Sequence, residues 1–99
     1  MEIIWTDRAS SNLNFFREQI RKESGVDDVA ERFYQKVILR TDKLENAPNW
    51  IGVPVKEYPG AGYMSLYVMD YRIIYRSTSD TVYIVAFVHR SMLIDGMLG

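Results

Sequence analysis

Four charged or titratable side chains lie in or beside two strand-like segments of the second half of the chain. Arg72 and Arg76 alternate with apolar residues in the run YRIIYR, which spans residues 71–76. Side chains of a strand alternate between its faces, so both arginines share one face, where a guanidinium can bind a phosphate or a carboxylate. His89 ends a later apolar run and is followed by Arg90, which adds a titratable ring and a further cation. We therefore expect a charged partner or substrate at the face that bears the arginines.

Lys56 and Glu57 form a second charged pair, a few residues after Gly52. Adjacent residues of a strand point to opposite faces, so at most one of the two serves a site on the arginine face. A structural interpretation stands beside the functional one. Strand arginines often make cross-strand contacts, and a lone histidine on an apolar strand is often a structural residue.

Composition excludes several classes of protein. The chain has 99 residues, no cysteine and one histidine, which indicates a single domain over residues 1–99 with no disulfide framework, no metal site and no cofactor. Twelve lysines and arginines stand against 13 aspartates and glutamates, too even a balance for binding nucleic acid by bulk charge. The apolar runs are too short for a membrane span or a secretory segment, so we expect a cytoplasmic protein.

The first half of the chain has the pattern of a short strand followed by two helices. Residues 2–5 favour a strand at a sheet edge or paired with a later strand, and a helix is predicted from about residue 7 to 23, where Gly25 stops it. Asp28 and Glu31 have the spacing of a capping box for a second helix, which Pro48 ends. The two apolar stripes comprise Ala9, Leu13, Phe16 and Ile20, and then Ala30, Phe33, Val37 and Leu44. A short connection between the helices makes them antiparallel.

The second half predicts a sheet. A weak edge strand covers residues 50–58, where Gly52 and Pro54 interrupt it, and strands at 63–68, 71–76 and 81–89 form an antiparallel meander. The last strand is apolar on both faces and should lie centrally. We expect the helices to cover the face with Tyr71, Ile73 and Tyr75, which leaves the arginine face open. The predicted class is α+β: two N-terminal antiparallel helices packed on a twisted, mainly antiparallel sheet of four to five strands.

At this point the sequence resembles the RelE/ParE superfamily of bacterial toxins from type II toxin–antitoxin systems. The order and spacing of several features support this resemblance: a strand ending in Trp5, a helix with Ala9 and Leu13, a helix closing on Leu44, Pro48 and Gly52 in a P-x-x-x-G junction, YRIIYR at 71–76, and a strand ending in Val88-His89-Arg90. The resemblance implies a growth-inhibiting, often plasmid-stabilising toxin, neutralised by a cognate antitoxin and able to form a toxin–antitoxin hetero-oligomer.

The superfamily has two mechanistic branches. RelE-like members cut messenger RNA on the ribosome, whereas ParE-like members act on DNA gyrase and have no known nuclease chemistry. For the nuclease branch, the resemblance implies that Arg72 clamps the phosphate, that His89 is the acid and that Glu57 or Lys56 assists. For the binding branch, the concave face and the C-terminal segment form the contact surface for the target or the antitoxin. The residues expected to make it are Lys56, Arg76, Arg90, Met92 and Leu93.

Two departures from the nuclease pattern favour the ParE-like branch. Many members have an arginine in a strand of the form L-R-x-L, whereas the corresponding stretch here, residues 63–66, is uncharged. Residues 51–99 contain four cations and four anions, so the sheet half is neutral. Positive charge strengthens binding to RNA, so this neutrality does not favour a nuclease. The ribosome-dependent nuclease remains the alternative, and a degenerate, non-toxic member that binds only an antitoxin is a further one. The apolar tail after Arg90 either packs on the sheet or forms a groove for the antitoxin.

Overall fold

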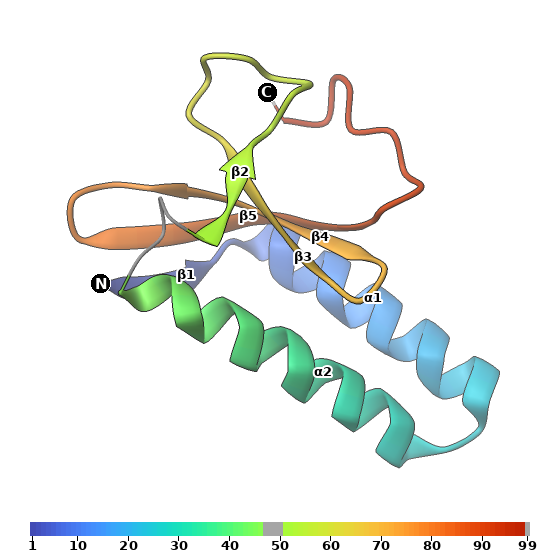
Figure 1. Ribbon diagram of the computed structural model, residues 1–99. Coiled ribbons are helices and arrows are strands. Elements are labelled where there is room, and N and C mark those ends of the chain that lie inside the picture. Colours follow the sequence, from blue (N-terminus) through green and yellow to red (C-terminus); the bar gives the residue numbers. More distant parts are fainter. Residues whose placement is uncertain (47–50, 99) are drawn as a thin grey trace.

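The computed structural model describes residues 1–46 and 51–98, and shows two helices packed on one face of a five-stranded sheet (Figure 1). The strands lie in the order β1-β5-β4-β3-β2. The elements are β1 (Glu2–Trp5), α1 (Asp7–Ser24), α2 (Asp27–Asp42), the short 3-10 helix η1 (Lys43–Glu45), β2 (Val53–Pro54), β3 (Met64–Val68), β4 (Tyr71–Ser77) and β5 (Thr81–His89). The predicted α+β architecture is confirmed. Pro48 and Trp50 lie outside the described residues.

The sheet is mixed because its first strand is parallel to its neighbour. β1 pairs with β5 in parallel, with Glu2 opposite Thr81 and Trp5 opposite Ile84. The pairs β5–β4 and β4–β3 are antiparallel, as the short connections of the predicted meander require, and β3–β2 is antiparallel as well. β5 therefore lies between β1 and β4, which explains why its sequence is apolar on both faces.

Helix α1 begins and ends where the sequence indicates. The Thr6 side chain caps its first turn, since Oγ1 accepts a hydrogen bond from the Ala9 N–H at 3.2 Å. Gly25 ends it in the left-handed region, at φ 68°, where the absence of a Cβ removes the usual steric cost. Ala9 and Leu13 are buried against the sheet, as their spacing predicts.

The capping box predicted for the second helix is wrong. α2 begins at Asp27, and its N-cap residue is Val26, which has no side-chain acceptor and makes no side-chain cap bond. The Asp28 and Glu31 carboxylates form ion pairs with Arg32 and Arg17 instead. α2 also ends earlier than Pro48, at Asp42, and the chain continues as η1.

The main core lies between the helices and the sheet. Tyr71, Ile73 and Tyr75 of β4 face the helices, as predicted. Tyr71 stacks on Phe87 at 5.1 Å between ring centroids and meets Phe16 edge-on at 5.1 Å. The apolar stripes of both helices pack against this aromatic cluster, and burial of such side chains is worth roughly 1.5–3 kcal/mol each. None of the helices in the described residues is long and apolar enough to span a membrane.

The predicted strand at residues 50–58 is mostly absent from the described part of that segment. Only Val53–Pro54 pair with β3, which leaves Lys56 and Glu57 in the turns that follow. Pro54 has no N–H to donate to a ladder, and the next backbone bond runs from the Val55 N–H to the Tyr63 carbonyl at 3.0 Å. Gly52 lies so close to β3 and β4 that a Cβ there would come within 2.9 Å of the Ser65 carbonyl oxygen and would clash with the Tyr75 hydroxyl.

The expectation that the arginine face is open is wrong, because two segments cover it. Figure 1 shows the segment after β2 and the C-terminal tail on one side of the sheet, with the helices on the other. These segments build a second core on β4 and β5, made of Val55, Ile74, Ala86, Val88, Ile94 and Leu98. The Tyr58 hydroxyl joins the two segments, since it donates to the Ile94 carbonyl at 3.1 Å and accepts from the Leu98 N–H at 2.8 Å. The apolar tail therefore packs on the sheet.

Candidate functional site

Arg72 and Glu57 form an ion pair on the covered face of the sheet. The Arg72 Nη1 atom lies 2.9 Å from Glu57 Oε2, and Arg72 is only 8% exposed. The Arg72 guanidinium, followed by a backbone N–H, lowers the pKa of the Glu57 carboxyl. The pair is therefore held as two opposite charges. Arg72 Nε is buried and makes no hydrogen bond within the described residues.

His89 lies on the other face of the sheet. It is paired directly opposite Tyr71 in the β4–β5 ladder, and the two rings meet edge-on at 5.3 Å between centroids. Residues opposite each other share a face, whereas Arg72, adjacent to Tyr71, points to the opposite face. His89 Nδ1 accepts from the Ser91 N–H at 3.2 Å and lies 2.7 Å from Ser91 Oγ. The structure brings Arg72 and Glu57 together and does not bring His89 to them.

Arg76 shares the face of Arg72, but its side chain contacts the covering loop. Its Nη2 donates to the Ala61 carbonyl at 2.8 Å, and its guanidinium carbon lies 4.1 Å from the Tyr63 ring centroid. Four residues of strand separate the two arginines by roughly 13 Å, so they do not hold one phosphate together. Lys56 is exposed and forms no ion pair in the part of the chain that the structure describes.

The remaining predicted contact residues lie at the start of the C-terminal tail. Arg90 is exposed and pairs with Asp70, with Nε 3.5 Å from Oδ1, beside the turn between β3 and β4. Met92 and Leu93 follow it and are 42% and 86% exposed. Two adjacent apolar side chains on the surface beside an exposed cation form a compact contact area, at the opposite end of β4 from Arg76.

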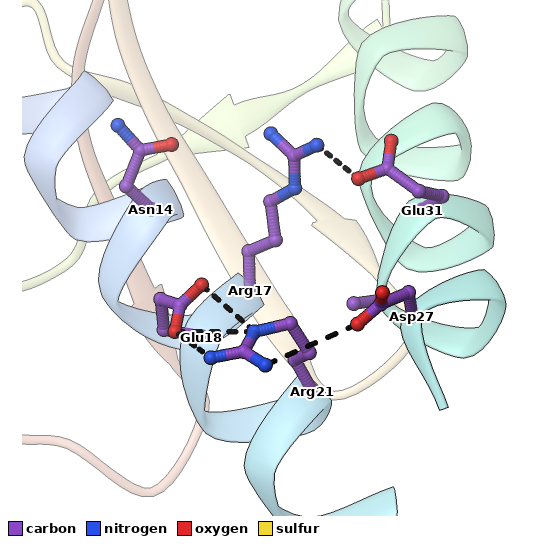
Figure 2. Close-up of a pocket in the computed structure, with 7 residues that line it drawn as sticks. Asn14, Arg17, Glu18, Arg21, Asp27 and Glu31 are labelled. Carbon is purple, nitrogen blue, oxygen red and sulfur yellow. Dashed lines mark hydrogen bonds and ion pairs between the residues drawn. The ribbon is translucent and has the colours of Figure 1, made fainter. Parts of the chain in front are cut away.

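Sequence reasoning missed a cluster of charges between the two helices (Figure 2). Arg17 of α1 is directed at Glu31 of α2, and Arg21 pairs with Glu18 at 2.8 Å and with Asp27 at 3.9 Å. They line a cleft of about 500 Å³. The signal was present in the sequence, since the arginines are four residues apart on one helix and the acids four apart on the next. These charges satisfy one another and join the helices, so the cleft offers no unpaired charge to a ligand.

The described residues, 1–46 and 51–98, hold no group of three or more histidine, aspartate or glutamate side chains placed to bind a metal ion. The site therefore presents an ion pair between a buried Arg72 and a partly exposed Glu57 on one face, His89 on the other face, and the exposed apolar side chains of Met92 and Leu93 on the tail.

The fold is shared with several solved proteins that are described as toxins or toxin–antitoxin systems. The structure resembles the solved "Chromosomal ParDE TA system from P. aeruginosa" with a TM-score of 0.78 at 18% identity, covering 90% of this chain and 95% of that one. It resembles the toxin–antitoxin complex RelBE2 from Mycobacterium tuberculosis at 0.66 and 23% identity, covering 90% and 96%. The third is a YoeB/ParE toxin from Agrobacterium tumefaciens, at 0.62 and 18% identity, covering 90% and 98%.

The family follows from the sequence match. A family model described as "ParE toxin of type II toxin-antitoxin system, parDE" matches residues 3–94, so the chain belongs to the ParE toxin family. A search of curated proteins gives no match. The resemblance to the RelE/ParE superfamily is thereby confirmed.

Proposed function

We propose that this toxin inhibits DNA gyrase by binding to it, as the resemblance to ParE-like members implies, and that it does not cleave RNA. The observation that supports this proposal best is the placement of the three candidate catalytic residues. Arg72 and Glu57 neutralise each other on a covered face, and His89 lies across the sheet from them.

The chemistry of RNA cleavage explains why this placement matters. Attack by a 2′-hydroxyl needs a base for its proton, a cation on the phosphate and an acid for the leaving oxygen, all within reach of one another. Glu57 is a weak base because Arg72 lowers its pKa. Arg72 is buried against that same carboxylate and is not displayed to a phosphate. His89 lies on the opposite face of the sheet, so it does not reach a substrate bound beside Arg72.

We also propose that a cognate antitoxin, encoded beside this toxin, neutralises it in a hetero-oligomer. Two of the similar structures are titled as a toxin–antitoxin system and a toxin–antitoxin complex. The exposed pair Met92 and Leu93 offers such a partner an apolar contact next to Arg90. A short neighbouring reading frame is expected, and its protein should co-purify with this chain when the two are expressed together. Elution of the two proteins separately contradicts this proposal.

The test of the function compares two readouts early after induction. Wild-type toxin is expected to induce the SOS response and alter plasmid supercoiling before any change in mRNA 5′ ends, and the purified toxin is expected to inhibit supercoiling by purified gyrase. Site-specific mRNA cuts would support the nuclease branch instead. Rapid translation arrest without cuts contradicts both branches.

A double variant, Arg72→Met with Glu57→Gln, separates binding from catalysis. Removing both charges together avoids leaving one of them buried without its partner. Gyrase inhibition is expected to stay within about threefold of wild type, a change of less than 1 kcal/mol. Cuts that occur with wild type and vanish in this variant would overturn the proposal.

A further inference from the structure

The end of the sheet that holds His89 forms a pocket of about 410 Å³ with α1. Its lining includes Phe15, Phe16, Gln19, Glu23, Tyr71 and His89. We propose that this pocket binds a cationic side chain, an arginine or a lysine, that a partner protein presents to it. The inference concerns recognition of a protein partner and does not depend on which cellular machine the toxin inhibits.

Aromatic rings form most of the walls. Phe15 and Phe16 meet edge-on at 5.3 Å between centroids, Phe16 and Tyr71 at 5.1 Å, and Tyr71 and His89 at 5.3 Å. A guanidinium or ammonium over an aromatic face gains about 0.5–1 kcal/mol at an exposed site and about 2 kcal/mol where water is excluded. Several rings at one pocket therefore favour a cation over an uncharged polar group.

The charge of the pocket has the sign that a cation requires. Glu23 lies at the pocket, no lysine or arginine lines it, and Glu23 forms no ion pair within residues 1–46 and 51–98. Burial, and then the charge of Glu23, raises the pKa of the Tyr71 hydroxyl. Asp70, the other acid that acts on Tyr71, already pairs with Arg90. Glu23 is thus the carboxylate available to a ligand.

The exposure of Phe15 has no structural explanation. Its neighbour Phe16 packs into the core, whereas Phe15 is 58% exposed on α1. An exposed phenyl ring is costly to leave in water, and its face can stack on a guanidinium.

The adjoining cavity shares Ile20 and Tyr71 with this pocket and carries charges of both signs. Arg32 and Lys36 of α2 line it together with Asp70, and Arg32 already pairs with Asp28. The pocket on the α1 side of Tyr71 has the Glu23 carboxylate and no lysine or arginine in its lining, so it is the better site for a cation.

The test is an NMR titration of the full chain with two capped tripeptides, acetyl-Gly-Arg-Gly-amide and acetyl-Gly-Gln-Gly-amide. The arginine peptide is expected to shift the signals of Phe15, Tyr71 and His89 and to bind at least threefold more tightly than the glutamine peptide. Equal affinity of the two peptides, or no shift at these residues, overturns the proposal.

Two variants with matched controls make the test specific. Glu23→Gln is expected to reduce arginine-peptide affinity to that of the glutamine peptide, whereas Asp42→Asn, an exposed acid at the end of α2, leaves it unchanged. Phe15→Ala is expected to weaken binding at least twofold, whereas Leu39→Ala, at an equally exposed position of α2, has no effect. Retention of full affinity in both Glu23→Gln and Phe15→Ala contradicts the assignment.

Discussion

At the scale of single residues, the ion pair between Glu57 and Arg72 makes stability depend on pH. The pKa of Glu57 is lowered in the folded protein, so the unfolded chain takes up the proton first as pH falls. The stabilisation is complete above the unfolded pKa, near 4.3, and is lost as pH falls through the lower folded value. We expect the free energy of unfolding, measured by urea denaturation, to decline between about pH 5 and pH 2.

Glu57→Gln isolates this contribution. At pH 7 the variant is expected to lose about 1–3 kcal/mol, because Arg72 stays buried without its counter-charge. Its stability should then vary less with pH than that of wild type below pH 5. Glu45→Gln, in η1, is the control and should keep the wild-type acid dependence. An unchanged acid slope in Glu57→Gln would contradict the assignment.

The sequence placed some of the site correctly and could not place the rest. The alternation of β4 put Arg72 and Arg76 on one face, a property of local backbone geometry. That this face is covered depends on Tyr58 and the tail, which reach it only through tertiary packing. The face of His89 depends on the β4–β5 register, which includes an irregularity at Ile74 and Tyr75 that no local pattern revealed.

At the scale of elements, the two helices differ in how they begin. Thr6 caps α1 with its side chain, whereas Val26 leaves the first N–H groups of α2 without such a bond. Val26 is half exposed, so replacing it costs little burial. Val26→Ser is expected to raise the free energy of unfolding by about 0.5–1 kcal/mol, measured by thermal or urea denaturation.

The control for this substitution is Val26→Ala, which removes the same apolar atoms without adding an oxygen. It should give no gain, so an equal rise in stability for both variants would show that capping is not the cause.

The wrongly predicted cap also shows a limit of motif reading. Asp28 and Glu31 have the correct spacing, but the helix begins two residues earlier than a cap at Asp28 requires, and both acids form ion pairs with arginines.

The sequence predicted the strands well where the alternation of apolar and polar residues alone defines them, and poorly where pairing depends on tertiary contacts. The period-two runs of β4 and β5 gave strands within one residue of the observed ends. The segment at 50–58 had enough apolar residues for a strand, but its pairing depended on the close approach of Gly52 to β3, which is a tertiary contact. Its described pairing is only the two residues of β2.

At the scale of the whole molecule, the sheet is shared by two cores. The helices cover one face, and the tail with the loop after β2 covers the other. β4 and β5 lie between these cores, which fits the prediction that the last strand is central. The tail is also held from the helical side, because Arg8 Nη1 donates to the Met97 carbonyl at 2.7 Å.

The Tyr58 side chain connects the loop after β2 with the C-terminal tail. Removing its hydroxyl tests whether these hydrogen bonds hold the tail on the sheet. Tyr58→Phe keeps the ring but removes both hydrogen bonds, from the hydroxyl to Ile94 O and from Leu98 N to the hydroxyl. The loss of about 1.4 kcal/mol at the tail should make the Leu98 amide exchange about tenfold faster. Amides of β5 should exchange as in wild type, because the helical core remains.

Tyr83→Phe, half exposed on β5, is the matched control. Faster exchange of the tail and β5 together would instead mean that the two cores unfold as one unit, so that the tail cannot open over Arg72 while the rest of the toxin stays folded.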